Sequence, residues 1–81
     1  MTRGELLNSL LEISRDVLDE EDLSFTEATP FEKIEEWDSL NHIHMVVRME
    51  KVFGIRFDAS ELQSVVKVGD LLDIVARLKG I

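Results

Sequence analysis

Hydrophobic residues recur at spacings of three and four positions in three stretches of the chain. These stretches cover residues 6–18, 40–53 and 71–78, and polar side chains fill most positions between the apolar ones. Such spacing places apolar side chains on one face of an α-helix, so each stretch predicts an amphipathic helix. A capping pattern at 58–61 predicts a further short helix over about 59–64, with Leu62 and Val65 facing inward. The expected fold class is all-α, a small four-helix bundle forming one domain over residues 1–81.

The first and last helices differ in their expected start signals. Thr2 and Glu5 have the spacing of a capping box, so the first helix should begin there and reach residue 17 or 18. The last helix has only Gly69 and Asp70 near its start, which predicts a poorly capped N-terminus.

The second helix is expected to begin at Ser39, reach residue 52 or 53 and stop at Gly54. The expected buried stripe contains Ile43, Val46, Met49 or Glu50, and Phe53, widened by Met45 and Val52. Leu40 and Val47 fall on the opposite, mostly polar face. They either contact a partner or reach the margin of the core.

A loop of about twenty residues separates these two helices, which is long for so small a domain. Its acidic run at 19–22 lacks the ligand spacing and glycine of a calcium loop, so we interpret it as a solvated turn. Thr29 and Pro30 predict a helical turn over about 30–35, with Thr29 as the cap. Apolar side chains should anchor the loop: Leu23, Phe25, Phe31, Ile34 and Trp37.

Composition narrows the function classes. The chain has 81 residues, a formal net charge of −8 and no cysteine. An acidic surface disfavours nucleic acid and anionic membranes, and no apolar run is long enough to span a membrane. The N-terminal residues lack the pattern of a signal peptide. We therefore expect a soluble, cytoplasmic monomer without membrane insertion and without thiol chemistry of its own.

Candidate chemistry concentrates where the long loop meets the second helix. Asp38 or Ser39 occupies the capping position, and an anion attached to Ser39 would be stabilised by unpaired backbone N–H groups and the helix dipole. His42 and His44 are two residues apart and cannot share a helix face as metal ligands, so both are interpreted as surface histidines. No catalytic residue and no metal site is predicted, and the protein is not expected to be an enzyme.

The chain resembles the acyl carrier protein family over essentially its whole length. The resemblance rests on the motif Asp38-Ser39-Leu40, on Phe53-Gly54-Ile55 at the end of the second helix, and on Val68-Gly69-Asp70-Leu71 at the start of the last. It implies that a carrier protein synthase (phosphopantetheinyl transferase) transfers 4'-phosphopantetheine from coenzyme A to Ser39. Acyl-activating and acyl-transferring enzymes would then use the thiol of this arm.

The resemblance also implies residues for cargo and partners. An acyl chain could enter between the second and third helices, although plain core packing explains the same side chains: Met45, Val46, Met49, Ile55, Ala59, Leu62 and Val65. Partner recognition would fall to Asp38, Leu40, Asn41, His44, Val47 and Lys51.

The second helix departs from the family pattern. Carriers of fatty acid synthesis usually show a strongly acidic second helix, whereas the matching positions here are Asn41, His44 and Lys51, and Glu50 alone is acidic. With this less acidic second helix, the chain is more similar to specialised discrete carriers, which favours a carrier for a dedicated biosynthetic pathway. The alternatives are an aminoacyl or peptidyl carrier, although the Gly-Gly-His-Ser pattern is absent, and an unmodified helical interaction module in which Ser39 only caps the helix.

Overall fold

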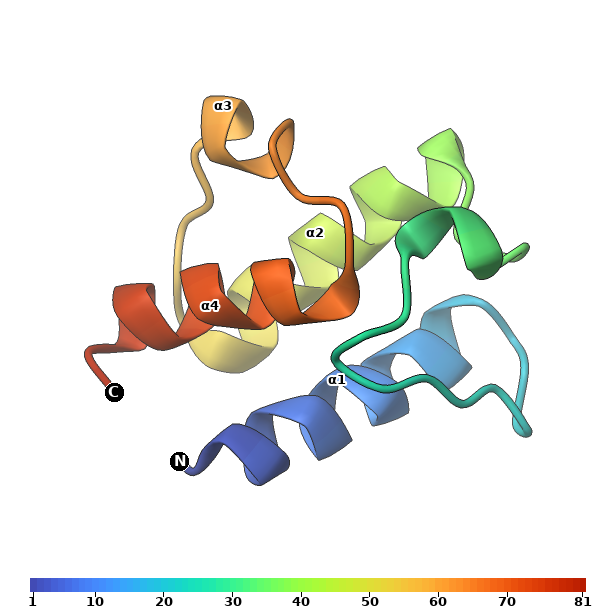
Figure 1. Ribbon diagram of the computed structural model, residues 1–81, viewed down its shortest axis with the longest axis horizontal. Helices are drawn as coiled ribbons and strands as arrows, with labels where there is room; N and C mark the ends of the chain where they lie inside the picture. Colours follow the sequence, from blue (N-terminus) through green and yellow to red (C-terminus); the bar gives the residue numbers. More distant parts are fainter.

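The computed structural model describes all residues 1–81 and confirms the all-α fold. In chain order the elements are α1 (Arg3–Val17), the 3-10 turn η1 (Phe31–Lys33), α2 (Ser39–Phe53), α3 (Ala59–Leu62) and α4 (Val68–Lys79). Figure 1 shows α1, α2 and α4 grouped together, with α3 beyond α4 on the side away from α1. None of the helices is both long and apolar enough to cross a membrane.

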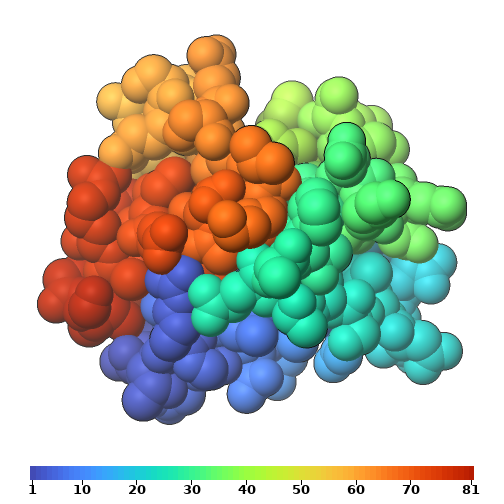
Figure 2. All heavy atoms as spheres, in the orientation of Figure 1, coloured from blue at the N-terminus to red at the C-terminus, as the bar shows by residue number.

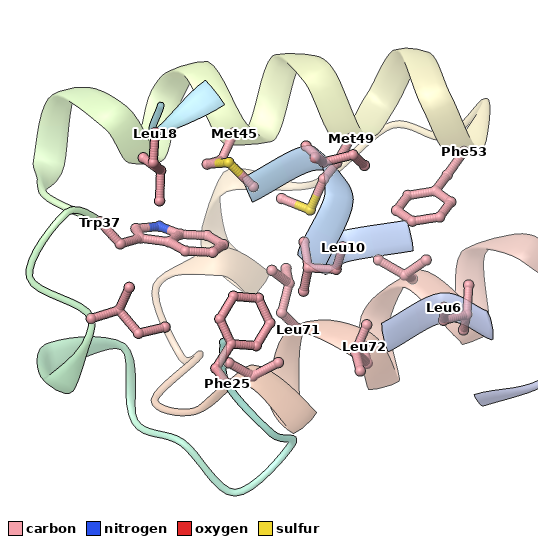
Figure 3. Packing of buried hydrophobic residues seen from close by; sticks show 14 residues of the cluster. Leu6, Leu10, Leu18, Phe25, Trp37, Met45, Met49, Phe53, Leu71 and Leu72 are labelled. Carbon is pink, nitrogen blue, oxygen red and sulfur yellow. The ribbon is translucent and has the colours of Figure 1, made fainter. Parts of the chain in front are cut away.

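One hydrophobic core joins the three long helices and the loop. It contains Leu6 and Leu10 from α1, Met45 and Met49 from α2, and Leu71, Leu72 and Val75 from α4, all of them at most 1% exposed. Phe25, Ile34 and Trp37 add the loop to the same core, as Figure 3 shows for the two aromatic rings. The chain therefore packs as a single unit, in which the loop is part of the core.

The buried face of α2 matches the predicted stripe in part. Met45, Met49 and Phe53 are buried as predicted, whereas Ile43 is 60% and Val52 is 54% exposed, contrary to the prediction. Two sets of apolar residues on this helix both have helical spacing, and the sequence alone does not distinguish them. The set with the flexible methionines and Phe53 packs against α1 and α4, which leaves Ile43 facing outward.

The predicted helix ends agree with the structure in some cases and not in others. The box at Thr2 is confirmed, and Gly54 ends α2 with a left-handed φ of 67°. The last helix is better capped than expected, because the Asp70 carboxylate accepts hydrogen bonds from the backbone N–H groups of Val66 and Lys67 at 3.1 Å each.

The short helix α3 ends at Leu62, earlier than predicted, and lacks a capping box. Its cap Asp58 accepts from the backbone N–H and the hydroxyl of Ser60, while Glu61 pairs with Arg77 on α4. The carboxylate that would close the box is therefore committed to another helix.

The loop between α1 and α2 is fastened to the segment before α4. Phe31 N–H donates to the carbonyl of Val66, and Gly69 N–H donates to the carbonyl of Glu27. A Cβ at Gly69 would lie 3.0 Å from that Glu27 oxygen, so the close approach favours glycine. Thr29 does not cap η1 as predicted, because its hydroxyl accepts from the backbone N–H of Thr26 within the loop. These contacts hold the loop in place up to the start of α2.

Candidate functional site

The capping side chain of α2 is that of Asp38, and Ser39 is the first helical residue. Asp38 Oδ1 accepts from the backbone N–H of Asn41 at 2.8 Å, and the Asp38 carbonyl accepts from the N–H of His42 at 2.8 Å. The exposed hydroxyl of Ser39 makes no hydrogen bond within the chain. The alternative in which Ser39 only caps the helix therefore disagrees with the structure.

Two backbone donors without a partner lie in the same first turn as this hydroxyl. The N–H groups of Ser39 and Leu40 have no hydrogen-bond partner in the protein, as is usual in the first turn of a helix. Together with the positive end of the dipole of a 15-residue helix, they favour an anion at this point. The site thus offers a free hydroxyl beside donors suited to a phosphate oxygen.

The loop residues before Ser39 are fixed by Trp37. The indole is 7% exposed and packs against the ring of Phe31 at a centroid distance of 4.6 Å. The amide of Asn41 also donates to the carbonyl of Glu36 at 2.8 Å, which ties the first turn of α2 back to the loop. Asn41, which we predicted as a partner contact, is half-buried and serves the local structure as well.

His42 differs from its predicted role as a surface histidine. Its Nδ1 accepts a hydrogen bond from the indole N–H of Trp37 at 2.9 Å, and its ring is half-buried. His44 is exposed, as predicted. The spacing from Trp37 to His42 covers one turn across a helix start, a signal that sequence inspection could have used once the helix boundary was known.

A groove of about 340 Å³ opens beside Ser39. Figure 2 shows the molecule hollowed between α3 and the start of α2. The groove is lined by Phe31, Trp37, Asp38, Ser39, His42, Leu62 and Val65. Its walls are mainly apolar, and Asp38 is the charged residue among them.

Only part of the predicted acyl-binding set lies at this groove. Leu62 and Val65 line it, whereas Met45 and Met49 are fully buried in the core and Ala59 is exposed. Val46 and Ile55 are partly buried and pack against the core. The predicted acyl-binding set therefore contains residues of two kinds, some in the groove wall and some in the core.

The predicted partner residues mostly share the exposed surface of α2. Leu40 is 64% and Val47 is 49% exposed, and His44 and Lys51 are exposed with them. Ile43 at 60% belongs to the same surface, although it was predicted to be buried. We call Leu40, Ile43 and Val47 the apolar strip of α2.

Comparisons with known proteins identify the family of this chain. Residues 8–75 match the family model described as "Phosphopantetheine attachment site". The matched range includes the start of α2 and the groove beside it. The fold and the match thus define a phosphopantetheine-bearing carrier, and the chain belongs to the acyl carrier protein family.

Individual relatives are described as acyl carrier proteins. An acyl carrier protein of Rubrobacter xylanophilus is 28% identical over 77 residues, which is 95% of each chain. The solution structure of holo acyl carrier protein from Geobacter metallireducens has a TM-score of 0.85 and 36% identity, over 93% of this chain and 86% of that one. The crystal structure of an acyl carrier protein from Thermotoga maritima has a TM-score of 0.83 and 28% identity, over 94% of this chain and 88% of that one.

Membership of the family gives the cofactor and the general role. Proteins of this family carry 4'-phosphopantetheine and are carriers without enzymatic activity of their own. The residues at the start of α2 fit the group, because a free hydroxyl, two free N–H donors and an adjacent groove lie together.

Proposed function

We propose that the Ser39 hydroxyl is the attachment point of 4'-phosphopantetheine in this carrier. The observation that supports this best is that different residues make the capping bond and carry the free hydroxyl at the start of α2. Asp38 caps the helix, which leaves the Ser39 hydroxyl exposed and free of hydrogen bonds. A modified Ser39 therefore costs the helix no capping bond.

Attachment follows from the position of the oxygen. Ser39 Oγ forms an ester bond to the phosphorus that coenzyme A supplies, the nucleotide part of coenzyme A leaves, and the hydroxyl proton passes to a base of the synthase. The N–H groups of Ser39 and Leu40, which have no partner in the protein, would stabilise the charge of the phosphodiester. The bound group supplies the thiol that holds the acyl chain as a thioester.

We further propose that the carrier serves a dedicated biosynthetic pathway and not bulk fatty acid synthesis. The exposed surface of α2 combines the apolar strip with His44 and Lys51, and Arg48 forms an ion pair with Asp16 of α1 at 2.6 Å. Such a surface suits a partner with an apolar docking face more than one with a strongly basic patch. In this proposal Asp38, Leu40, Asn41, His44, Val47 and Lys51 are the recognition residues.

The proposed carrier works as a monomer consisting of one domain over 1–81, in the cytoplasm, where coenzyme A and the synthase act. A single core cluster shared by all three long helices supports the one-domain assignment. Its partners are the synthase and the enzymes that load and unload the acyl group.

Intact-mass analysis tests the attachment point. After incubation with coenzyme A and a broad-specificity synthase, the protein should gain the mass of one phosphopantetheinyl group. Ser39→Ala should gain none, whereas Ser60→Ala, which removes another exposed hydroxyl near a helix start, should be modified normally. An adduct that persists in Ser39→Ala would rule out this attachment point.

Binding and loading assays test the pathway proposal. Affinity for fatty acid synthase enzymes should be low and should depend weakly on salt, because the surface of α2 carries little negative charge. Tight binding that weakens steeply with added salt would contradict a dedicated pathway. Loading with acyl and aminoacyl donors in parallel separates an acyl carrier from an aminoacyl or peptidyl carrier.

A further inference from the structure

We propose that His42 is a positioning residue for the arm: held by Trp37, its neutral imidazole donates the Nε2–H to the phosphodiester on Ser39. The proposal rests on the proposed attachment at Ser39. It assigns a specific polar contact to the groove, whose other walls are mainly apolar.

The contact with Trp37 determines which nitrogen carries the proton. An indole N–H can only donate, so the His42 Nδ1 that receives it at 2.9 Å must be unprotonated. A neutral imidazole then carries its proton on Nε2. The fixed ring therefore presents a donor at Nε2.

That donor has no partner within the protein. His42 makes one side-chain hydrogen bond, to Trp37, and no acceptor of the chain bonds its Nε2. The ring is half-buried and lines the groove beside Ser39. Nε2–H is thus a donor without a partner in the protein, and the ring cannot turn without losing the bond to the indole.

His42 and Ser39 also share a helix face. Residues three apart on an α-helix lie about 5–6 Å from each other between Cβ atoms, which a phosphodiester on the serine can bridge. Figure 3 shows the Trp37 ring beneath α2 with its nitrogen turned toward that helix. The indole thus supports the imidazole, and both rings line the groove beside Ser39.

The surroundings favour one kind of ligand atom. Asp38, the cap that precedes α2, is the charged residue of the groove, and its carboxylate is engaged by the Asn41 N–H. The turn η1 contributes Phe31 and α3 contributes Leu62, without charge. A donor among apolar walls and beside two free backbone N–H groups suits an anionic oxygen. The phosphodiester of the arm is the anion that the proposed function places there.

Nuclear magnetic resonance tests both steps. In the unmodified protein at mildly alkaline pH, the 15N shifts of His42 should show a protonated Nε2 and an unprotonated Nδ1. In the modified protein, the 31P resonance of His42→Leu should shift and narrow, because the phosphate loses a contact and moves more freely. His42→Gln should stay near the wild-type resonance, since an amide can accept from Trp37 and donate to the phosphate.

Two further variants make the result specific. His44→Gln changes an exposed histidine outside the groove and should leave the 31P resonance unchanged. Trp37→Phe removes the indole donor but keeps His42, so the imidazole should lose its fixed tautomer and the 31P resonance should move part of the way. Amide spectra of each variant would establish that it is folded.

The outcomes separate this contact from the attachment itself. An unchanged 31P resonance in a folded, modified His42→Leu, or a protonated Nδ1 in the wild type, would overturn the His42 contact alone. Absence of any adduct on the wild-type protein would overturn the proposed function and the contact together.

Discussion

Two helices of this protein have the same length and begin beside a hydroxyl residue, but they use the hydroxyl differently. At α1, the Thr2 hydroxyl accepts from the Glu5 N–H at 3.2 Å, and the Glu5 carboxylate accepts from the Thr2 N–H at 2.8 Å. At α2, Asp38 makes the capping bond and the Ser39 hydroxyl makes none. A shift of one position, from cap to first helical residue, separates a structural hydroxyl from an available one.

The segments that lead into the two helices differ as well. Met1, before the cap of α1, is 51% exposed, whereas Trp37, before the cap of α2, is 7% exposed. The hydroxyl without a structural role is therefore the one whose surroundings are held most firmly. This combination suits the proposed attachment at Ser39, since an attachment point must be accessible and also fixed relative to the surface that partners bind.

The largest expected effect concerns the residue that fixes the loop. Trp37→Ala should destabilise the protein by about 3–5 kcal/mol, because it leaves a large cavity in the core. That is a substantial part of the about 5–15 kcal/mol by which small domains are usually stable. Urea unfolding would measure the loss.

Leu40→Ala is the matched control for this change, since it alters an exposed apolar side chain three residues further on. It should change the unfolding free energy by less than about 0.5 kcal/mol. Similar losses for the two variants would show that the loop before α2 is not anchored through Trp37.

The caps themselves are expected to give intermediate effects. Thr2→Ala and Asp38→Ala should each cost about 0.5–2 kcal/mol, because each removes the side chain that satisfies a first-turn N–H group. Ser39→Ala should change stability by less than about 0.5 kcal/mol. Chemical denaturation of the three variants, each without phosphopantetheine, would measure these changes in unfolding free energy. A loss in Ser39→Ala equal to that in Asp38→Ala would mean that both side chains share the capping role.

Much of this arrangement could be predicted from sequence because it is local. The box at Thr2, the left-handed stop at Gly54 and the start of α2 at Ser39 depend on residues within one turn of each other. Local hydrogen bonds of this kind leave a fixed spacing in the chain. The positions of these helix ends were therefore predicted within a residue or two.

The remaining features depend on contacts between distant segments. The predicted stripe of α2 included Ile43 and Val52 together with Met45 and Met49, and only packing against α1 and α4 determines that the two methionines are buried and Ile43 and Val52 are not. Glu61 has the right spacing for a capping box but pairs with Arg77 of α4 instead. Patterns within one helix do not contain this information.

The role of His42 was missed for a related reason. The spacing of His42 and His44 excludes a shared metal site, but it gives no information about other partners of His42. Its actual partner is an indole one turn earlier, on the other side of the helix start. Pairing polar side chains across a predicted cap would have indicated this bond.

The smallest expected effect is the pH dependence of the two helix starts. Hydrogen bonds from the backbone N–H and the hydroxyl of Thr2 lower the pKa of Glu5. A carboxyl whose pKa is lower in the folded state stabilises the fold above its unfolded pKa of about 4.3, and this contribution is lost as the pH falls through the folded value. The start of α2 has Asn41 at the equivalent position, which does not titrate.

Glu5→Gln should therefore reduce the loss of stability below about pH 4, while changing stability at neutral pH only slightly, because the carboxylate is exposed. Unfolding free energies measured in urea at several acidic pH values would show this as a shallower slope. Glu35→Gln, which removes an exposed carboxylate without a hydrogen bond, should leave the slope closer to that of the wild type. An equal reduction in both variants would assign the acid sensitivity to general surface charge. The hydrogen bonds that Glu5 receives from Thr2 would then make no specific contribution to stability at acid pH.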